Sequence, residues 1–438
     1  MPYRVPAIAV SLLGDKRDFG REMRVIVLGA GVIGATTAYE LLRDGHDVTV
    51  LDRRAEAASE TSFANAGLVA PSHAFSWASP SAPKMLLRSL WRDDQALRFR
   101  PSLDPALWRW TLKFLGQCST ARAAENSQRK ALLCLYSQSR LGVINGETEL
   151  AYDGQQGGLL FLYRSRESFA AAQAKMRILQ EVGVAVEALT PERAAEIDPA
   201  LAPVAEHLAG ALYGPNDESG DARRFTRALT QRCQEMGADV RFGTTITGFE
   251  RDGDRIAGVT TDQGTLTADA VVLCLGIYSP HLARQLGERL PIYPIKGYSV
   301  TLPVAGRNNP PKLGGVDEDN LVAYCPMGDR VRITATAEFS GYDKSHQPRD
   351  FRHMLAVARQ LFPNAGDYSQ PNYWAGLRPM TPRGIPIFGR GRHKNLYYNT
   401  GHGHMGWTMS CGSARIAADL VAGREPEIDI AGMRLQDA

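Results

Sequence analysis

Three glycines and one aspartate near the start of the chain have the types and spacing to bind a dinucleotide. Gly29, Gly31 and Gly34 form the pattern GxGxxG, and Asp52 follows them. Gly29 would permit a tight turn, Gly31 would let the backbone approach a pyrophosphate, and Gly34 would let a helix pack closely on a strand. Free N–H groups at the helix start attract phosphates. Because an acidic residue here accepts ribose hydroxyls, Asp52 favours FAD or NAD over NADP.

The elements around this pattern are those of a β-α-β unit. Residues 24–28 are predicted to form a buried strand, a helix follows and ends at Gly45, and residues 48–51 form a second strand closed by Asp52. The alternative is a plain tight turn, which is less favoured because both strands, the helix and the acid are present. The next loop, ETSFANAGLVAP (60–71), is small and hydroxylic. It could run along a pyrophosphate toward a flavin ring, or be an ordinary loop.

A second glycine-rich region near the C-terminus raises a question that composition leaves open. GLRPMTPRGIPIFGR and NTGHGHMGWTMSCGSARIAADLVAG place arginines, two histidines and many glycines between Gly376 and Gly423. These residues either build a reactive site or form a loop and helix that close the fold.

Composition excludes several classes of protein. The chain has 438 residues, 44% hydrophobic and 22% charged, with a net charge of +3, so two domains and no nucleic-acid partner are expected. Six scattered cysteines without a CxxC pair predict no metal site and a cytoplasmic location. No apolar run is long enough to span a membrane. Residues 1–22 are interpreted as an N-terminal extension.

The remaining elements predict an α/β fold with an α+β substrate domain. A helix from about Ala222 leads into a strand at 239–242, two turns follow at 252–254 and 262–264, and a buried strand at 270–275 ends in Gly276. The Rossmann-like domain is expected to comprise 23–80, 205–288 and 373–432. An antiparallel-sheet domain is expected to comprise 81–204 and 289–372.

Tryptophan-rich helices are expected near residues 84–118. Leu107, Trp108, Leu112 and Leu115 fall on one helical face. This face would pack over the second domain, or it would touch a membrane surface or a quinone.

Taken together, the ordered stretches ETSFANAG, PNDESGD, YPIKGYSVT, GLRPMTPRGIPIFGR and NTGHGHMGWTMSCGS resemble the D-amino-acid dehydrogenase branch of the FAD-dependent amino-acid oxidoreductases. The resemblance runs from Met23 nearly to the end. It implies non-covalent FAD, because sarcosine-oxidase relatives attach flavin through a cysteine where this chain has Gly376. It also implies oxidation of a D-amino acid to a 2-oxo acid and ammonia by hydride transfer to flavin N5.

The resemblance assigns roles to individual residues. Arg378 would hold the substrate carboxylate; His404, Tyr298 and Tyr324 would contact substrate or serve only the structure. The implied cofactor contacts fall in three groups: Val27, Gly29, Gly31, Val32, Ile33, Gly34, Asp52, Arg53 and the backbone of Ile246 at the ADP half; Ser62, Asn65, Ala66, Gly67, Leu68, Gly276 and Gly376 near the middle; and Gly403, His404, Met405, Gly406, Trp407 and Thr408 at the flavin's pyrimidine end.

One departure from the family's sequence pattern leaves the preferred substrate open. Close relatives tend to carry a Gly-Gly pair where this chain has Thr334 and Ala335. A D-proline or D-hydroxyproline dehydrogenase, a glycine- or sarcosine-type oxidase that makes H2O2, a flavin-carrying electron-transfer subunit and an NAD-dependent dehydrogenase therefore stay open as alternatives. The resemblance favours a quinone or respiratory-chain acceptor over O2, and peripheral contact with the cytoplasmic face of the inner membrane stays open. The oligomeric state is left open.

Overall fold

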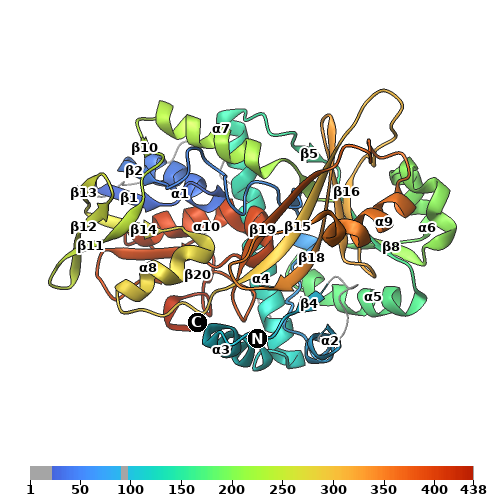
Figure 1. The fold of residues 1–438 in the computed structure, drawn as a ribbon, viewed down its shortest axis with the longest axis horizontal. Helices are drawn as coiled ribbons and strands as arrows, with labels where there is room; N and C mark the ends of the chain where they lie inside the picture. The colour runs from blue at the N-terminus through green and yellow to red at the C-terminus, as the bar shows by residue number, and fades with distance from the viewer. Residues whose placement is uncertain (1–21, 90–96, 438) are drawn as a thin grey trace.

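The computed structural model describes residues 22–89 and 97–437, and in this part the chain forms two principal sheets. Figure 1 shows the smaller sheet with its helices on the left and the larger sheet on the right. The predicted N-terminal extension, 1–22, lies almost wholly outside the described residues.

The smaller sheet is the predicted dinucleotide-binding sheet. Its six strands run in the order β10-β2-β1-β14-β21-β20, and each neighbouring pair is parallel except β20 with β21. The strands are β1 (Arg24–Leu28), β2 (Asp47–Leu51), β10 (Asp239–Arg241), β14 (Ala270–Leu273), β20 (Ile387–Arg390) and β21 (Leu396–Thr400). The prediction of the first strand is confirmed residue for residue, and β2 begins one residue earlier than expected.

The apolar run of β1 is explained by burial on both of its faces. Val25 and Val27 enter the core with α1 (Val32–Arg43), α7 (Ala222–Glu235) and α10 (Gly406–Val421). Ile26 and Leu28 enter a second core on the opposite face with α8 (Ser279–Gln285). The long helix α4 (Thr120–Thr148) contacts α10 from outside.

A small antiparallel sheet caps the second core. It consists of β11 (Ile246–Asp252), β12 (Arg255–Thr261) and β13 (Gly264–Thr267). The turns predicted at 252–254 and 262–264 are confirmed. Ile256 and Val259 from β12 pack against the strands of the parallel sheet.

The larger sheet has nine strands in the order β19-β15-β18-β17-β16-β6-β8-β7, with β4 beside β18. It is antiparallel apart from β16 with β6 and β18 with β4. The strands are β4 (Leu97–Phe99), β6 (Leu159–Tyr163), β7 (Glu187–Leu189), β8 (Gly210–Gly214), β15 (Tyr293–Pro303), β16 (Gly314–Asp317), β17 (Val322–Met327), β18 (Arg330–Phe339) and β19 (Asn372–Met380).

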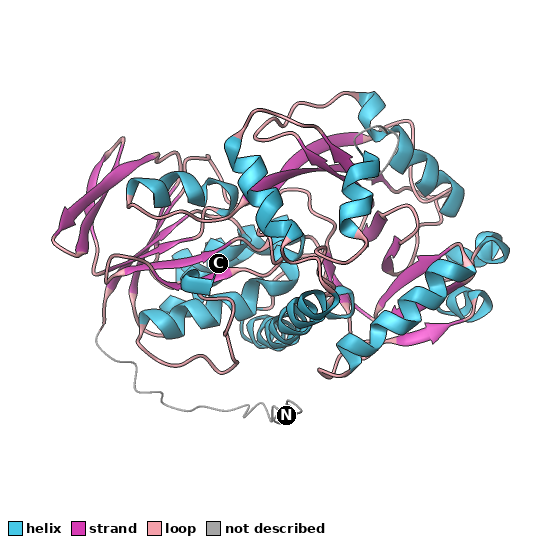
Figure 2. Cartoon of the chain, turned by 90° about the horizontal axis from the view of Figure 1, so that it is seen from below, coloured by secondary structure: helices cyan, strands magenta, loops and turns pink. Residues whose placement is uncertain are grey.

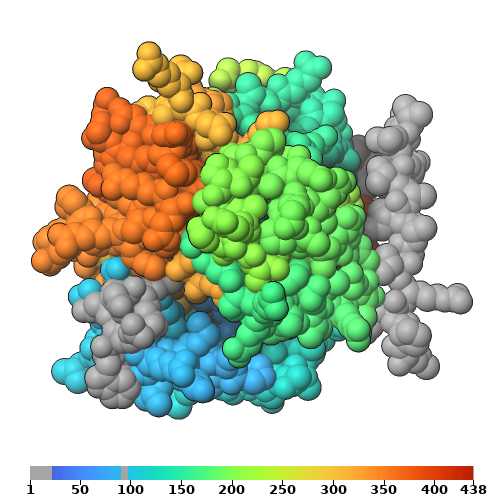
Figure 3. All heavy atoms as spheres, turned by 90° about the vertical axis from the view of Figure 1, so that its right-hand side faces the viewer, coloured from blue at the N-terminus to red at the C-terminus, as the bar shows by residue number. Residues whose placement is uncertain are grey.

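Helices α6 (Pro191–Ile197) and α9 (Arg352–Leu361) cover one face of this sheet, and their apolar residues fill a core of their own. Figure 3 shows the outer surface on this side, with the region of α6 in green and that of α9 in orange. Helix α5 (Arg166–Gln180) packs on the opposite face, against β6 and β8. The rest of the opposite face looks toward the parallel sheet. A short ribbon of β3 (Leu68–Val69), β5 (Gln155–Gln156) and β9 (Glu218–Ser219) lies between them.

Two of the predicted domain boundaries are wrong for strands of the larger sheet. The expected Rossmann segments 205–288 and 373–432 include β8 and nearly all of β19, yet β8 pairs with β6 and β7 and β19 pairs with β15. Strand pairing depends on partners far away in sequence, which the local apolar pattern of a strand does not specify.

The tryptophan-rich segment forms α2 (Ala82–Ser89) and α3 (Pro105–Leu115), which share one apolar core. Figure 2 shows the chain from below, with helices in cyan beside the strands in magenta. The apolar face predicted for the helix now called α3 is buried in part and exposed in part. Leu107 is buried, whereas Trp108, Leu112 and Leu115 are 45%, 70% and 40% exposed. Among the described helices, none is both long enough and apolar enough to cross a membrane.

Candidate active site

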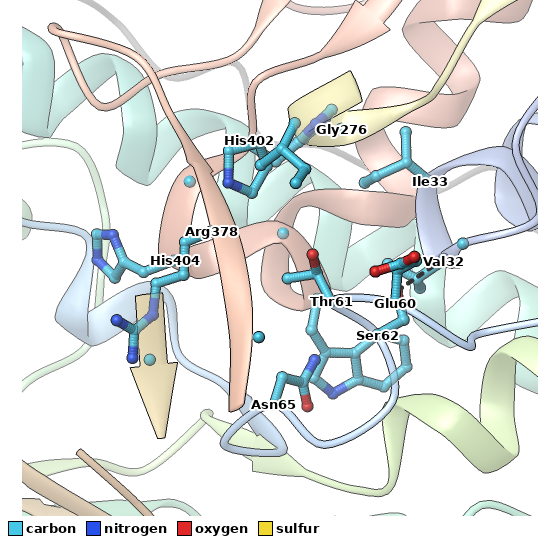
Figure 4. A pocket seen from close by; sticks show the side chains of 18 of the residues that line it. Val32, Ile33, Glu60, Thr61, Ser62, Asn65, Gly276, Arg378, His402 and His404 are labelled. Carbon is cyan, nitrogen blue, oxygen red and sulfur yellow. Dashed lines mark hydrogen bonds between the residues drawn. The ribbon is translucent and has the colours of Figure 1, made fainter. Parts of the chain in front are cut away.

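One cavity of about 550 Å³ joins the β1–α1 turn to the inner face of the larger sheet. Figure 4 shows its lining, with Val32, Ile33 and Ser62 on one side and Arg378 and His404 on the other. The structure brings most of the predicted residues to this cavity: Gly29, Gly31, Val32, Ile33, Asp52, Arg53, Ser62, Asn65, Ala66, Gly67, Leu68, Ile246, Gly276, Tyr298, Gly376, Arg378, Gly403, His404, Met405, Gly406, Trp407 and Thr408.

The glycines of the N-terminal turn have the geometry that the sequence predicted. Gly29 has φ of +105°, a conformation that favours glycine. A Cβ on Gly34 would lie 1.8 Å from the carbonyl oxygen of Gly29, so Gly34 serves helix–strand packing and does not itself line the cavity. A Cβ on Gly31 would meet only Ser62 Oγ, at 3.5 Å, so the space beside Gly31 is open to a ligand.

Asp52 and Ser62 order this turn. The Asp52 carboxylate accepts the N–H of Ala30 at 2.8 Å and that of Arg54 at 2.8 Å, while Ser62 Oγ accepts the N–H of Val32 at 3.1 Å. Burial raises the pKa of Asp52, and the two backbone donors oppose that change. Since carboxylate oxygens have further lone pairs, Asp52 remains able to accept ribose hydroxyls.

Val27 is a correction to the predicted cofactor contacts. Its side chain is fully buried in the core with Val50 and Val272, and it does not line the cavity. A residue in the middle of a strand buried on both faces has no exposed side to offer a ligand.

The start of α10 supplies the other end of the cavity. The 3-10 turn Gly403–Met405 runs directly into the 16-residue helix α10, whose N-cap Met405 makes no side-chain cap bond. No acidic residue stands in the first turn. The unsatisfied N–H groups and the positive end of the helix dipole therefore face the cavity, where they favour negative charge.

Three buried polar atoms test whether this cavity suits a polar cofactor. Asn399 Oδ1, His404 Nε2 and Trp407 Nε1 are buried without a hydrogen-bond partner, and all three residues line the cavity. Buried polar atoms are normally paired, so these atoms fit a bound molecule that carries donors and acceptors. Together with the bare glycine turn and the uncapped helix, they fit a dinucleotide with a polar ring system.

Arg378 is a partly buried cation without an acidic partner in the described part of the chain. Its Nη1 donates to the carbonyl oxygen of Thr336 at 2.7 Å, and no carboxylate there lies within ion-pair distance. Burial lowers the pKa of Arg378 to about 10, so the guanidinium stays charged at neutral pH. A buried charge without a counter-ion is costly, and an anion in the cavity would supply one.

His404 lies beside Arg378 in Figure 4 and is held by stacking. Its ring and that of Trp77 have centroids 4.6 Å apart at 22°. Burial is the main cause that lowers the pKa of His404 well below its ordinary value, and the nearby cations Lys130, His73 and Arg378 lower it further. His404 is therefore neutral, with one ring nitrogen free for a ligand.

The structure places the two tyrosines predicted for the site, Tyr298 and Tyr324, differently. The Tyr324 ring stacks edge-on against Phe362 in the core beneath the sheet, so the prediction that it lines the pocket is wrong; its neighbour Ala323 lines the cavity instead. The side chains of adjacent strand residues point to opposite faces. Tyr298 borders the cavity, while its hydroxyl donates to Glu338 at 2.8 Å and its ring meets Phe351 in the same core. Its contact with substrate stays a prediction.

Sequence reasoning missed several lining residues. Trp77 and His73 come from the segment after β3, and Trp374 stands two residues before Gly376. A Cβ on residue 376 would lie 1.9 Å from the Trp374 ring, which also stacks on Phe63. Gly376 therefore leaves room for an indole. The tryptophans were visible as large aromatics near the motifs, but nothing in their spacing distinguished cavity from core.

A dinucleotide-binding turn, an uncapped helix and an arginine without an acidic partner in the described residues meet around one cavity, which is the arrangement of a dinucleotide-dependent oxidoreductase. A model of the DAO family, described as FAD dependent oxidoreductase, matches residues 24–420. The chain belongs to this family, and its cofactor is FAD.

Individual relatives agree with this assignment. The chain is 46% identical to D-amino acid dehydrogenase 2 of Mesorhizobium japonicum, across 94% of this chain and 99% of that relative. It is 46% identical to a D-amino acid dehydrogenase of Paramagnetospirillum magneticum, across 94% and 98%. A glycine oxidase structure from Bacillus cereus has the same fold, with a TM-score of 0.70 and 24% identity over 92% of this chain and 96% of the other.

Proposed function

We propose that this protein oxidises D-amino acids to 2-oxo acids and ammonia, with non-covalent FAD as cofactor and a quinone or another non-oxygen acceptor as electron sink. The names of the relatives at 46% identity support the substrate class. The observation that carries the proposal is Arg378, a partly buried cation that faces the cavity without an acidic partner in the described residues. A free amino-acid carboxylate is the counter-ion that suits it.

FAD, when bound, supplies the acceptor for two electrons and the hydrogen of Cα. The residues that would hold it are the Gly29–Gly31 turn, Asp52, the 60–68 loop and the start of α10. The uncapped N-terminus of α10 would stabilise negative charge on the reduced cofactor.

The substrate steps follow from the residues around Arg378. The guanidinium holds the carboxylate and so fixes the orientation of Cα. The ammonium group must lose one proton before oxidation, because the amine lone pair forms the C=N bond. A neutral His404 with a free ring nitrogen is a candidate acceptor for a hydrogen bond from that amine. Water then hydrolyses the imine to the 2-oxo acid and ammonia.

The exposed apolar side chains of α2 and α3 support membrane contact in this proposal. Met85 and Leu87 on α2 are 44% and 57% exposed, and Trp108 and Leu112 are exposed on α3. The basic residues Lys84, Arg88, Arg109 and Lys113 are exposed on the same two helices. Apolar side chains flanked by cations fit the interface of an anionic membrane, where a quinone would be accessible.

The substrate and acceptor are tested by anaerobic bleaching of the FAD absorbance. D- and L-amino acids, glycine, sarcosine and D-hydroxyproline are compared at equal concentration, and O2 or a quinone analogue is then admitted. The proposal expects fast bleaching by D-amino acids and reoxidation by the quinone analogue. Bleaching only by L-amino acids would contradict the stereochemistry, preference for the cyclic amine would indicate the rival dehydrogenase, and rapid H2O2 formation would indicate an oxidase.

Membrane contact is tested separately, with vesicles containing an anionic lipid. Wild-type protein is expected to sediment with these vesicles, and a Trp108→Glu and Leu112→Glu double variant is expected to remain in the supernatant with its FAD bound. Equal sedimentation of both proteins would contradict this surface as the contact. Vesicles of neutral lipid provide the control for charge.

A further inference from the structure

The guanidinium of Arg378 lies across a neighbouring strand. Arg378 is on β19, which pairs with β15, and β15 in turn pairs with β18. Its Nη1 nevertheless donates to the carbonyl of Thr336 on β18. The side chain therefore crosses the full width of β15 to reach its partner.

The crossing point on β15 is Gly297. A Cβ at this position would lie 2.5 Å from both Cζ and Nη2 of Arg378, and 2.8 Å from Nη1. These separations are far below van der Waals contact. Any side chain at position 297 would displace the guanidinium, so the absence of a side chain there is what allows the crossing.

The acceptor on β18 sits in a bulge. Lys296 pairs with Glu338 and Tyr298 pairs with Ala335, so two steps along β15 correspond to three along β18. Thr336 lies in this interval with φ of +68°, the left-handed region that a β-branched residue rarely occupies. A bulge re-aims a backbone group out of the regular ladder, and here the group is the carbonyl that Arg378 contacts.

We infer that Gly297 and the bulge at Thr336 form a seat that fixes the orientation of the Arg378 guanidinium for its ligand. The inference rests on the proposed role of Arg378 as the carboxylate receptor. With Nη1 engaged by Thr336, the remaining guanidinium donors are available to the cavity as a bidentate pair. Gly297 and Thr336 are positioning residues, because they act through Arg378.

The strained backbone favours this explanation over a purely structural one. A non-glycine residue at positive φ is retained where surrounding structure requires it, often beside a binding site. If the bulge only stabilised the sheet, nothing would require a cation without a carboxylate partner to lie over a bare glycine.

The test uses four variants of the FAD-loaded protein: Gly297→Ala, Arg378→Ala, the double variant, and Gly248→Ala as a matched control. Gly248 is also a strand glycine, but a Cβ there would meet only Gln285, at 3.7 Å. KM and kcat are measured with D-alanine. The dissociation constant of benzoate, a carboxylate that is not oxidised, is measured from the change it causes in the flavin absorbance.

The inference expects Gly297→Ala to raise KM and the benzoate dissociation constant together, about 10- to 100-fold, which corresponds to one misplaced charged hydrogen bond. The kcat value at saturation and the FAD content should change much less. Gly248→Ala should match wild type. Adding Gly297→Ala to Arg378→Ala should have no further effect on benzoate binding, because the displaced group is already absent.

The outcomes separate the seat from the proposed function. If Arg378→Ala leaves both constants unchanged, the carboxylate role of Arg378 is wrong. If Arg378→Ala raises them while Gly297→Ala does not, the seat alone is wrong. An additive effect in the double variant also overturns the seat. If Gly297→Ala alone fails to hold FAD, the double variant must recover FAD binding because the overlap is gone; failure to recover overturns the inference.

Discussion

A methionine in place of Lys130 should make the protein more stable at neutral pH. Lys130 lies in the middle of α4 and is fully buried, and its Nζ donates to the carbonyl of Phe75 at 2.9 Å. Burial lowers its pKa to about 8, from 10.5 when exposed. Bringing the charge into the protein therefore costs free energy that an apolar side chain of similar length avoids.

The size and sign of the effect follow from proton linkage. The gap between about 8 in the folded chain and 10.5 in the unfolded chain is worth roughly 3 kcal/mol. Between these two pH values the unfolded chain binds more protons, so the stability of the wild type rises with pH across this window. Below pH 8 the full cost is present. Lys130→Met should therefore gain up to roughly 3 kcal/mol at pH 7, less the lost hydrogen bond, and nothing near pH 10.5.

The assay is denaturant unfolding of FAD-loaded wild type and Lys130→Met at several pH values from 7 to 10.5. The two stabilities should converge as pH rises. Lys175→Met provides the control, because Lys175 is exposed on α5. Curves for wild type and Lys130→Met that stay parallel over the whole range would refute the assignment of a buried, charged Lys130.

Two further predictions concern packing and the buried ion network. Gly34→Ala should abolish FAD retention, measured as bound flavin per protein, because its Cβ would overlap the Gly29 carbonyl oxygen at 1.8 Å; Gly146→Ala, with nothing within 4 Å, should retain FAD. Arg415→Leu should lower the free energy of unfolding by about 3–5 kcal/mol, because Arg415 is buried and pairs with Glu40 and Asp419 at 2.8 and 2.9 Å. A loss below 1 kcal/mol would contradict that role.

The parts of the fold that were predictable are those specified locally. The β1–α1–β2 unit and the two turns of β11–β13 depend on glycines and on short apolar runs, and their bounds were found within a residue or two. Which side chains of the large sheet face the cavity could not be predicted from local sequence in the same way. Tyr324 and Ala323 are adjacent, and which of them faces the cavity depends on the register of β17 with β16 and β18.

The site shows the same division. Arg378 and the start of α10 were indicated by sequence stretches that resemble a family, but the seat of Arg378 was not. Gly297 looks like any strand glycine until the arginine of another strand is placed over it. The positive φ of Thr336 likewise has no local signal, since threonine normally favours regular strands. Contacts across three strands exist only in the folded sheet.

The charges around His404 link the substrate to its surroundings. Lys130, His73 and Arg378 all lower the pKa of this imidazole, in addition to burial. His73 is itself paired with Glu318 at 2.7 Å, which leaves Arg378 and Lys130 as the cations without a carboxylate partner in the described residues. In the proposed function, a carboxylate bound by Arg378 neutralises one of these two. The bound carboxylate acts to raise the pKa of His404, and the ammonium group of the same substrate acts to lower it until that ammonium proton has left.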